Sequence, residues 1–144
     1  MDGDNLREGI TGRPHVIKPN IHELSRLVGR ELTEMADVLD AAREVHRTGI
    51  ETVLVSMGGR GIILVGADER CHATPPAVKV INTIGAGDSA VAGFIYGQSK
   101  GLGLQKSLKF AVAAGTASTL QSGTALAHLE EVERLVAQVH IESV

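Results

Sequence analysis

The sequence predicts a single-domain α/β fold spanning residues 1–144, with helices packed on a mainly parallel sheet. Short β-branched runs alternate along the chain with longer segments whose apolar residues recur at helical spacing. Two of these runs are followed at once by glycine-rich turns, which in such sheets lie at the carboxyl ends of the strands. Of the 144 residues, 43% are hydrophobic, which is enough for one domain with its own core.

The first predicted elements are a strand and a helix near the N-terminus. Residues 15–18 read as a short buried strand that ends at Pro19, and Asn20 is suited to cap the helix that follows. Gly29 is the expected stop of this helix. The apolar residues on one face of the helix are Ile21, Leu24, Leu27 and Val28.

A second helix is expected over residues 34–48, with Thr33 as its N-cap and Gly49 at its end. Turn residues and β-branched runs then predict two strands that pair antiparallel, with a further short strand before Pro75. These segments are a strand at 52–56, a turn at 57–61, a strand at 62–65 and a strand at 70–74.

The remaining chain predicts one more strand and three helices. The strand, residues 77–81, leads into a glycine-rich segment at 82–88. Apolar spacing then predicts the helices, which run from Asp88 to about 99, from 104 to about 120, and from 129 to 140.

Composition excludes several classes of function. The net charge of −3 and the lack of a basic run argue against a nucleic-acid partner. No apolar run reaches the length of a membrane span, and the N-terminus lacks the features of a signal peptide. The single cysteine, Cys71, cannot form an internal disulfide and fits a reducing compartment. We therefore expect a cytoplasmic protein.

Residues 82–88 are where we expect the chemistry. Gly85 and Gly87 have no Cβ, so a large anion can approach the backbone amides, and the unpaired N–H groups of a helix that starts here favour a phosphate. Asp88 is placed to take a proton from a hydroxyl that attacks phosphorus. The alternative is that Asp88 only caps the helix and the glycines make a tight turn.

Residues 82–95 read Asn-Thr-Ile-Gly-Ala-Gly-Asp-Ser-Ala-Val-Ala-Gly-Phe-Ile. This stretch resembles the second signature of the ribokinase-like carbohydrate kinases, the PfkB family. The resemblance implies a ribokinase-like layered fold. It also implies that Asp88 is the catalytic base and that the amides of Gly85, Ala86 and Gly87 form the anion hole.

Asn20 and Glu23 lie three residues apart on a first helical turn, so both side chains reach one face, where they can order Mg²⁺ through water. The same pair also makes a capping box. Asn20-x-x-Glu23 resembles the family's Mg²⁺–phosphate motif, which also places Asn20 at the nucleotide. Lys18 either contacts a phosphate or is a solvated lysine at a strand end.

Residues 56–61 are similar to the family's nucleotide loop, in which Ser56, Gly58 and Gly61 pass close to ATP. A hairpin turn needs the same glycines. We expect Arg60 to be exposed.

Residues 110–120 form a small-residue helix, for which close packing is the default interpretation. The resemblance places Val112 and Thr116 beside the adenine. It also implies a monovalent cation, K⁺, near Asn82, Ile84, Ser118 and Gly123.

The sequence gives little support for a histidine metal site, a P-loop or a serine hydrolase site. The histidines show no metal-ligand spacing, and the P-loop pattern is absent. Gly87-Asp88-Ser89 resembles the nucleophile motif of serine hydrolases of the Gly-Asp-Ser-Leu kind. Residue 90 is Ala and not Leu, however, and no candidate histidine is found to activate the serine.

The resemblance runs from about Asp2 over nearly the whole chain, yet it matches only the C-terminal half of a kinase of roughly 300 residues. The N-terminal part, with the sugar-binding residues and the lid, is absent by this resemblance. It implies ATP-dependent phosphorylation of a phosphosugar, fructose 6-phosphate to fructose 1,6-bisphosphate, within the phosphofructokinase and tagatose-6-phosphate kinase branch. The alternatives are a 1-phosphofructokinase, a tagatose-6-phosphate kinase, or a non-catalytic nucleotide-binding fragment. Because half a sheet exposes a strand edge, we expect a homodimer or larger assembly.

Overall fold

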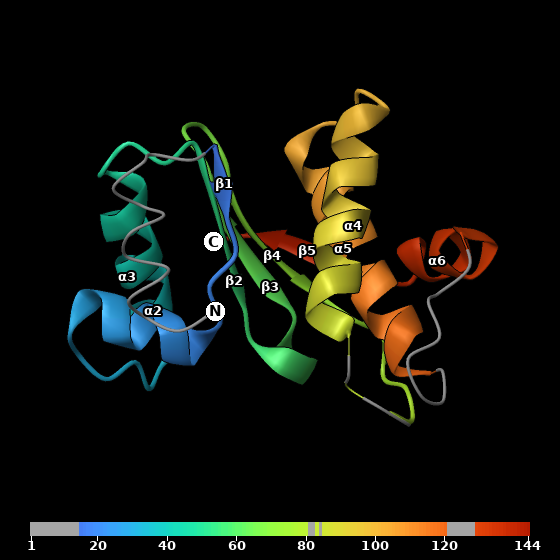
Figure 1. Ribbon diagram of the computed structural model, residues 1–144, viewed down its shortest axis with the longest axis horizontal. Helices are drawn as coiled ribbons and strands as arrows, with labels where there is room; N and C mark the ends of the chain where they lie inside the picture. Colours follow the sequence, from blue (N-terminus) through green and yellow to red (C-terminus); the bar gives the residue numbers. More distant parts are fainter. Residues whose placement is uncertain (1–14, 81–82, 84, 121–128) are drawn as a thin grey trace. The chain divides into compact units, whose positions relative to one another are not determined.

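The computed structural model describes residues 15–80, 83, 85–120 and 129–144 (Figure 1). Contacts divide the chain into two compact units. The first unit comprises Met1–Gly58, Ile62–Cys71 and Ser143–Val144, and the second comprises Gly59–Gly61 and His72–Glu142. That all 144 residues act as one domain stays a prediction.

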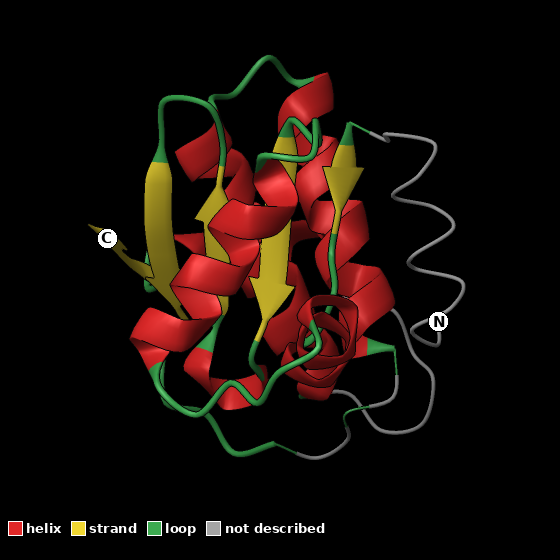
Figure 2. Ribbon diagram, turned by 90° about the vertical axis from the view of Figure 1, so that its left-hand side faces the viewer, coloured by secondary structure: helices red, strands yellow, loops and turns green. Residues whose placement is uncertain are grey.

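The chain combines helices with strands, as an α/β fold class predicts (Figure 2). The elements are β1 (Val16–Ile17), α2 (Ile21–Val28), α3 (Met35–His46), β2 (Thr52–Ser56), a 3₁₀ turn η1 (Gly58–Arg60), β3 (Ile62–Val65), β4 (Arg70–Thr74), α4 (Ala86–Ser99), α5 (Leu104–Thr119), α6 (Leu129–Val136) and β5 (His140–Ser143).

The sheet is mixed, with strand order β1-β2-β3-β4-β5. Strand β1 pairs parallel with β2, so that Val16 lies opposite Thr52. Strand β2 pairs antiparallel with β3, as expected from the turn between them, and Leu54 lies opposite Leu64. The carboxyl ends of β1 and β2 therefore meet at one edge, which is where a site is expected in such sheets.

The core of the first unit lies between its strands and the helices α2 and α3, which cover the same face of β1, β2 and β3 (Figure 1). Side chains alternate along a strand, so one set of residues from β2 and β3 faces these helices. The buried cluster consists of Ile17, Leu24, Val38, Ala41, Ala42, Val45, Ile50, Val53, Val55, Met57, Ile63 and Val65.

The cap of α3 differs from the sequence prediction. The helix begins after Glu34, not Thr33. The reason is Asp37, whose Oδ2 accepts hydrogen bonds from the Glu34 amide at 3.0 Å and from the Thr33 amide at 3.3 Å and hydroxyl at 3.1 Å. These bonds lower the pKa of Asp37, the Glu34 amide being the main cause. The carboxylate thus satisfies backbone donors at the start of the helix.

Two other predictions are wrong in the described residues. The helix expected over 129–140 ends at Val136, and β5 begins at His140. Residues 77–80 form no strand, and Val80 is 53% exposed. In both places, apolar residues recur at the spacing of a helix or a strand, but the backbone does not form that element.

In the second unit, α4 and α5 pack closely because glycines bring their backbones together. A Cβ on Gly93 would overlap the carbonyl oxygen of Phe110. A Cβ on Gly115 would lie 3.3 Å from the carbonyl oxygen of Ala86, in the first turn of α4. The small-residue helix therefore serves close packing, as the default interpretation predicted, and this packing fixes the start of α4 against α5.

Candidate functional site

The start of α4 carries the glycine motif. Gly85 is the N-cap residue and has a left-handed backbone, with φ of 82°. The Ala86 amide donates to the Thr83 carbonyl at 3.3 Å, and the Ser89 amide donates to the Gly85 carbonyl at 2.9 Å. The helix thus begins two residues earlier than predicted. Only a residue without Cβ adopts this turn readily, and the amides in the first turn of a helix have no partner within the helix itself.

Asp88 lies in the first turn of α4 and is exposed. Because Gly85 is the N-cap residue, Asp88 does not hold the capping position that the alternative gave it. A carboxylate in the first turn still interacts favourably with the helix dipole. Its role as a base stays a prediction.

The predicted adenine neighbours, Val112 and Thr116, lie one turn apart on α5 and are almost fully buried. Gly115, next to Thr116, packs on the first turn of α4. Within the second unit, the helix turn that carries the predicted adenine neighbours therefore packs on the predicted anion-hole segment. Ser118, a predicted cation neighbour, donates its hydroxyl to the Gly115 carbonyl at 2.8 Å.

In the first unit, Asn20 and Ser56 come together at the carboxyl ends of β1 and β2. They form an isolated parallel bridge, and the Ser56 amide donates to the Pro19 carbonyl at 3.0 Å. The metal candidate and the nucleotide-loop serine are thus neighbours. This contact could not be predicted, because it depends on the register between two strands that are distant in the chain.

Asn20 and Glu23 form the capping box that the structural alternative predicted. The Glu23 amide donates to Asn20 Oδ1 at 2.8 Å, and the Asn20 amide donates to Glu23 Oε1 at 3.0 Å. Carboxylate and amide oxygens are also the ligands that Mg²⁺ prefers, so this donor set suits the metal that the family motif implies. Capping and metal binding are compatible, and the metal role stays a prediction.

The two loop glycines differ in their surroundings. Gly58 is exposed with φ of 60°, and nothing lies near the position of a Cβ. Gly61 is buried with φ of 90°, and a Cβ would overlap the carbonyl oxygen of Ala73 in β4. Packing against β4 therefore explains Gly61 without a nucleotide, whereas Gly58 leaves room for one. Arg60 is exposed, as expected.

Three candidates, Asn82, Ile84 and Gly123, lie outside the described residues. Among the described residues, no group of three or more His, Cys, Asp or Glu side chains could hold a metal ion. In that same part of the chain, no helix is long and apolar enough to cross a membrane.

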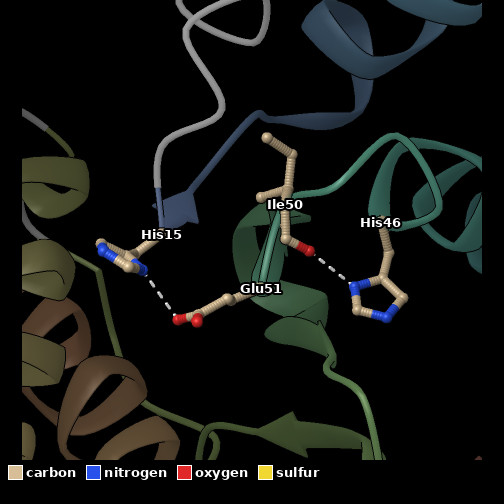
Figure 3. Close-up of polar contacts among 4 residues, drawn as sticks. All are labelled: His15, His46, Ile50 and Glu51. Carbon is tan, nitrogen blue, oxygen red and sulfur yellow. Dashed lines mark hydrogen bonds and ion pairs between the residues drawn. The ribbon is translucent and has the colours of Figure 1, made fainter.

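Two histidines of the first unit, His15 and His46, have structural partners (Figure 3). His15 Nδ1 lies 2.8 Å from Glu51 Oε2, and His46 Nδ1 donates to the Ile50 carbonyl at 2.7 Å. These contacts connect the start of β1 and the end of α3 to the residues just before β2. They agree with the interpretation of the histidines as surface or packing residues.

Comparison with known proteins agrees with the family resemblance of these motifs. The sequence profile of the pfkB family carbohydrate kinases matches residues 3–131. The 1-phosphofructokinase of Vibrio cholerae is 36% identical over 97% of this chain, and the one of Escherichia coli K12 is 35% identical over 96%.

Solved structures agree with these relatives. Phosphofructokinase-2 from Escherichia coli, in complex with substrates and products, superposes with a TM-score of 0.90 and 36% identity over 95% of this chain. Further structures of that enzyme are described as a complex with potassium and as a tetrameric inhibited form.

The match is partial in length. The chain spans 44% of the Vibrio cholerae relative and 45% of the Escherichia coli structure. The family profile, in contrast, covers most of this chain and includes both the Asn20–Glu23 pair and the glycine motif at the start of α4. The chain therefore belongs to the pfkB family of carbohydrate kinases.

Proposed function

We propose that this chain carries the nucleotide-binding and proton-transfer part of an ATP-dependent phosphosugar kinase. The observation that carries the proposal is the start of α4, where a left-handed Gly85 precedes a first turn that contains Asp88. A phosphate is favoured at such a helix start, and a carboxylate beside it can reach a hydroxyl that attacks the phosphate.

In the proposed mechanism, Asp88 takes the proton of the sugar hydroxyl as its oxygen attacks the γ-phosphorus of ATP. The amides of Gly85, Ala86 and Gly87 stabilise the charge that develops on the transferred phosphoryl group. Val112 and Thr116 border the adenine, and Ser56 and Gly58 border the rest of the nucleotide. Asn20 and Glu23 would hold Mg²⁺, which neutralises phosphate charge when bound.

For the acceptor we propose fructose 1-phosphate. The sequence alone pointed to fructose 6-phosphate, but the relatives cited above are named 1-phosphofructokinases. The likeness to phosphofructokinase-2 keeps fructose 6-phosphate as the second candidate. The potassium complex and the tetrameric form of that enzyme support, by analogy, a K⁺ site and an assembly of two or more chains.

Titration calorimetry of ATP with Mg²⁺ against the 144-residue chain tests the nucleotide site. We expect saturable binding that Gly87→Val abolishes, because the added side chain would block the approach of phosphate to the helix start. Gly103→Val is the matched control, since Gly103 is the N-cap residue of α5 and has open space around it. A folded chain that binds no ATP, or equal binding by both variants, would contradict the proposal.

Co-expression of the chain with the remaining part of the Vibrio cholerae enzyme tests the catalytic role. In such a complex, Asp88→Asn should lower kcat by a factor on the order of 10² to 10⁴ and leave ATP affinity largely intact. Near-normal turnover would remove Asp88 from the role of base. Assaying fructose 1-phosphate and fructose 6-phosphate side by side compares the two acceptors.

A further inference from the structure

The nucleotide loop, residues 56–61, joins β2 to β3 and is rich in glycine. Three of its residues, Gly58, Gly59 and Gly61, are glycines. Glycine loses more conformational freedom on folding than any other residue, so a loop of this composition does not hold one shape by itself. Contacts from outside the loop must therefore select the 3₁₀ turn that Gly58–Arg60 adopts.

Strand β4 supplies two such contacts, both at the end of the loop that leads into β3. His72 Nε2 lies 2.7 Å from the carbonyl oxygen of Arg60. Gly61, the next residue, packs so closely on β4 that a Cβ would overlap the carbonyl oxygen of Ala73. Arg60, Gly61, His72 and Ala73 all belong to the second unit, so both contacts are internal to that unit.

The contact between His72 and Arg60 has a definite direction. A carbonyl oxygen can only accept, so the imidazole donates from Nε2. The distance of 2.7 Å is at the short end of the range for N–H···O hydrogen bonds. The donor also has a firm base, because Cys71 and Ala73, on either side of His72, are 1% and 0% exposed. A well-anchored strand residue thus holds a peptide carbonyl of the loop.

We propose that His72 is a positioning residue for the nucleotide, which keeps the nucleotide loop in the conformation that binds ATP. The bond to the Arg60 carbonyl fixes the peptide group that leads into Gly61, whose left-handed backbone has φ of 90°. A site that is ordered before its ligand arrives loses no affinity to the ordering of its own backbone. His72 therefore acts on ATP through the loop and without touching it.

The alternative is a purely structural bond between β4 and the loop. Such a bond would lower the mobility of the loop or stabilise the fold without changing the affinity for ATP. The two roles are separated by variants that keep or remove the donor and by measuring loop order and ATP binding on the same proteins.

His72→Gln and His72→Met form a matched pair of variants. The amide nitrogen of Gln lies the same number of bonds from Cβ as His Nε2 and donates, whereas Met has a similar length and no N–H group. In titration calorimetry of ATP with Mg²⁺ against the 144-residue chain, His72→Met should raise Kd about two- to tenfold, as expected for the loss of one hydrogen bond. His72→Gln should restore the affinity of the wild type.

His140→Met is the control for removing an imidazole from a strand. His140 begins β5, and its Nε2 lies 3.8 Å from Glu142 Oε2 instead of bonding a loop carbonyl. We expect this variant to bind ATP as the wild type does. A loss of affinity equal to that of His72→Met would overturn the proposal, because the effect would then not depend on the bond to Arg60.

NMR relaxation of the backbone amides measures loop order without ATP. The order parameters of Arg60 and Gly61 should be about 0.85 in the wild type and in His72→Gln, and should fall towards about 0.6 in His72→Met. Equal order parameters in all three proteins would overturn the proposal. So would a mobile loop in His72→Met with unchanged ATP affinity, which would leave His72 with a structural role only.

The positioning role rests on the proposed nucleotide site, and the two can fail separately. A folded wild-type chain that binds no ATP would refute the nucleotide site and the positioning role with it. ATP binding that is equal in the wild type and in His72→Met would refute the positioning role and leave the nucleotide site in place.

Discussion

Gly97 of α4 lies directly against Ser107 of α5, so that a Cβ on Gly97 would be 2.7 Å from both the Cα and the Oγ of Ser107. Ser107 cannot easily turn aside, because its Oγ accepts a hydrogen bond from Gln98 Nε2 at 2.7 Å. The two helices therefore approach one another as closely as a glycine allows.

Gly97→Ala should accordingly destabilise the chain by about 1 to 3 kcal/mol through overpacking. In a helix without this contact, the same change would stabilise by up to about 1 kcal/mol. Gly59→Ala is the control, because nothing lies near a Cβ at that position. Urea unfolding measures both variants, and a stabilised Gly97→Ala would contradict the close packing.

The two roles of the Asn20–Glu23 pair can be separated. Asn20→Ala removes the cap and should lower the free energy of unfolding by about 1 kcal/mol. Glu23→Gln keeps an oxygen that can accept from the Asn20 amide but loses the charge. It should therefore change stability little and raise the Mg²⁺ concentration needed for ATP binding. An unchanged Mg²⁺ dependence in calorimetry would leave Glu23 with capping alone.

The pKa of Asp37 is lowered by the Glu34 amide first and by Thr33 second. A carboxyl group with a lowered pKa in the folded state stabilises the fold above its ordinary value of 3.8, and this contribution is lost as the pH falls below it. Asp37→Asn should therefore destabilise the chain at pH 7 and make its stability less sensitive to acid as the pH falls below 3.8. Urea midpoints at several pH values measure this, with Asp40→Asn on the same helix as the control. Parallel curves for the wild type and Asp37→Asn would contradict it.

Burial raises the pKa of the Cys71 thiol to about 11, with the charge of Glu69 as a smaller cause. Cys71 is 1% exposed, so the folded protein should react very slowly with a thiol reagent at pH 8 and rapidly once unfolded in urea. Since the pKa is raised, stability should be constant below the ordinary value of 9.0 and fall as the pH rises from there towards 11. Rapid labelling of Cys71 without urea would contradict this prediction and show that β4 opens easily in the folded protein.

Much of the fold was predictable from local patterns. The strands at 52–56, 62–65 and 70–74 have the predicted bounds, because alternating or continuous apolar runs are bounded there by glycine, proline or charged residues. Helix α2 begins after Asn20 and ends at Gly29, whose φ is 72°, as the capping residues indicated. These features depend only on neighbouring residues.

The errors have a different origin. Val139 continues the helical spacing of α6 and is buried, yet it follows a turn that no glycine or proline marks. Val78 and Val80 are β-branched, but a strand also needs a partner for its backbone, and propensity does not supply one. At Thr33, a carboxylate four residues later overrode a good N-cap residue.

For the candidate site, the sequence predicted the local backbone of the glycine motif better than the contacts between distant segments. The glycine motif lies at a helix start, as predicted, and Gly85 takes the backbone conformation that the motif requires. The bridge between Asn20 and Ser56 could not be predicted, because the register of two parallel strands depends on the packing of the whole unit. The contact of Gly61 with Ala73 could not be predicted either, because it depends on how separate segments of the chain pack together.

The parallel pairing of β1 with β2 bears on the order in which the chain folds. Two helices separate these strands, whereas β2 and β3 are joined by a short turn. Closing the longer loop costs more chain entropy, so the hairpin should form before β1 is added. In pulsed hydrogen exchange, the amides of Thr52 and Ser56, which donate to His15 and Pro19, should gain protection later than those of the β2–β3 ladder. The edge of the first unit where Asn20 meets Ser56 would then be among the last parts of that unit to assemble during refolding.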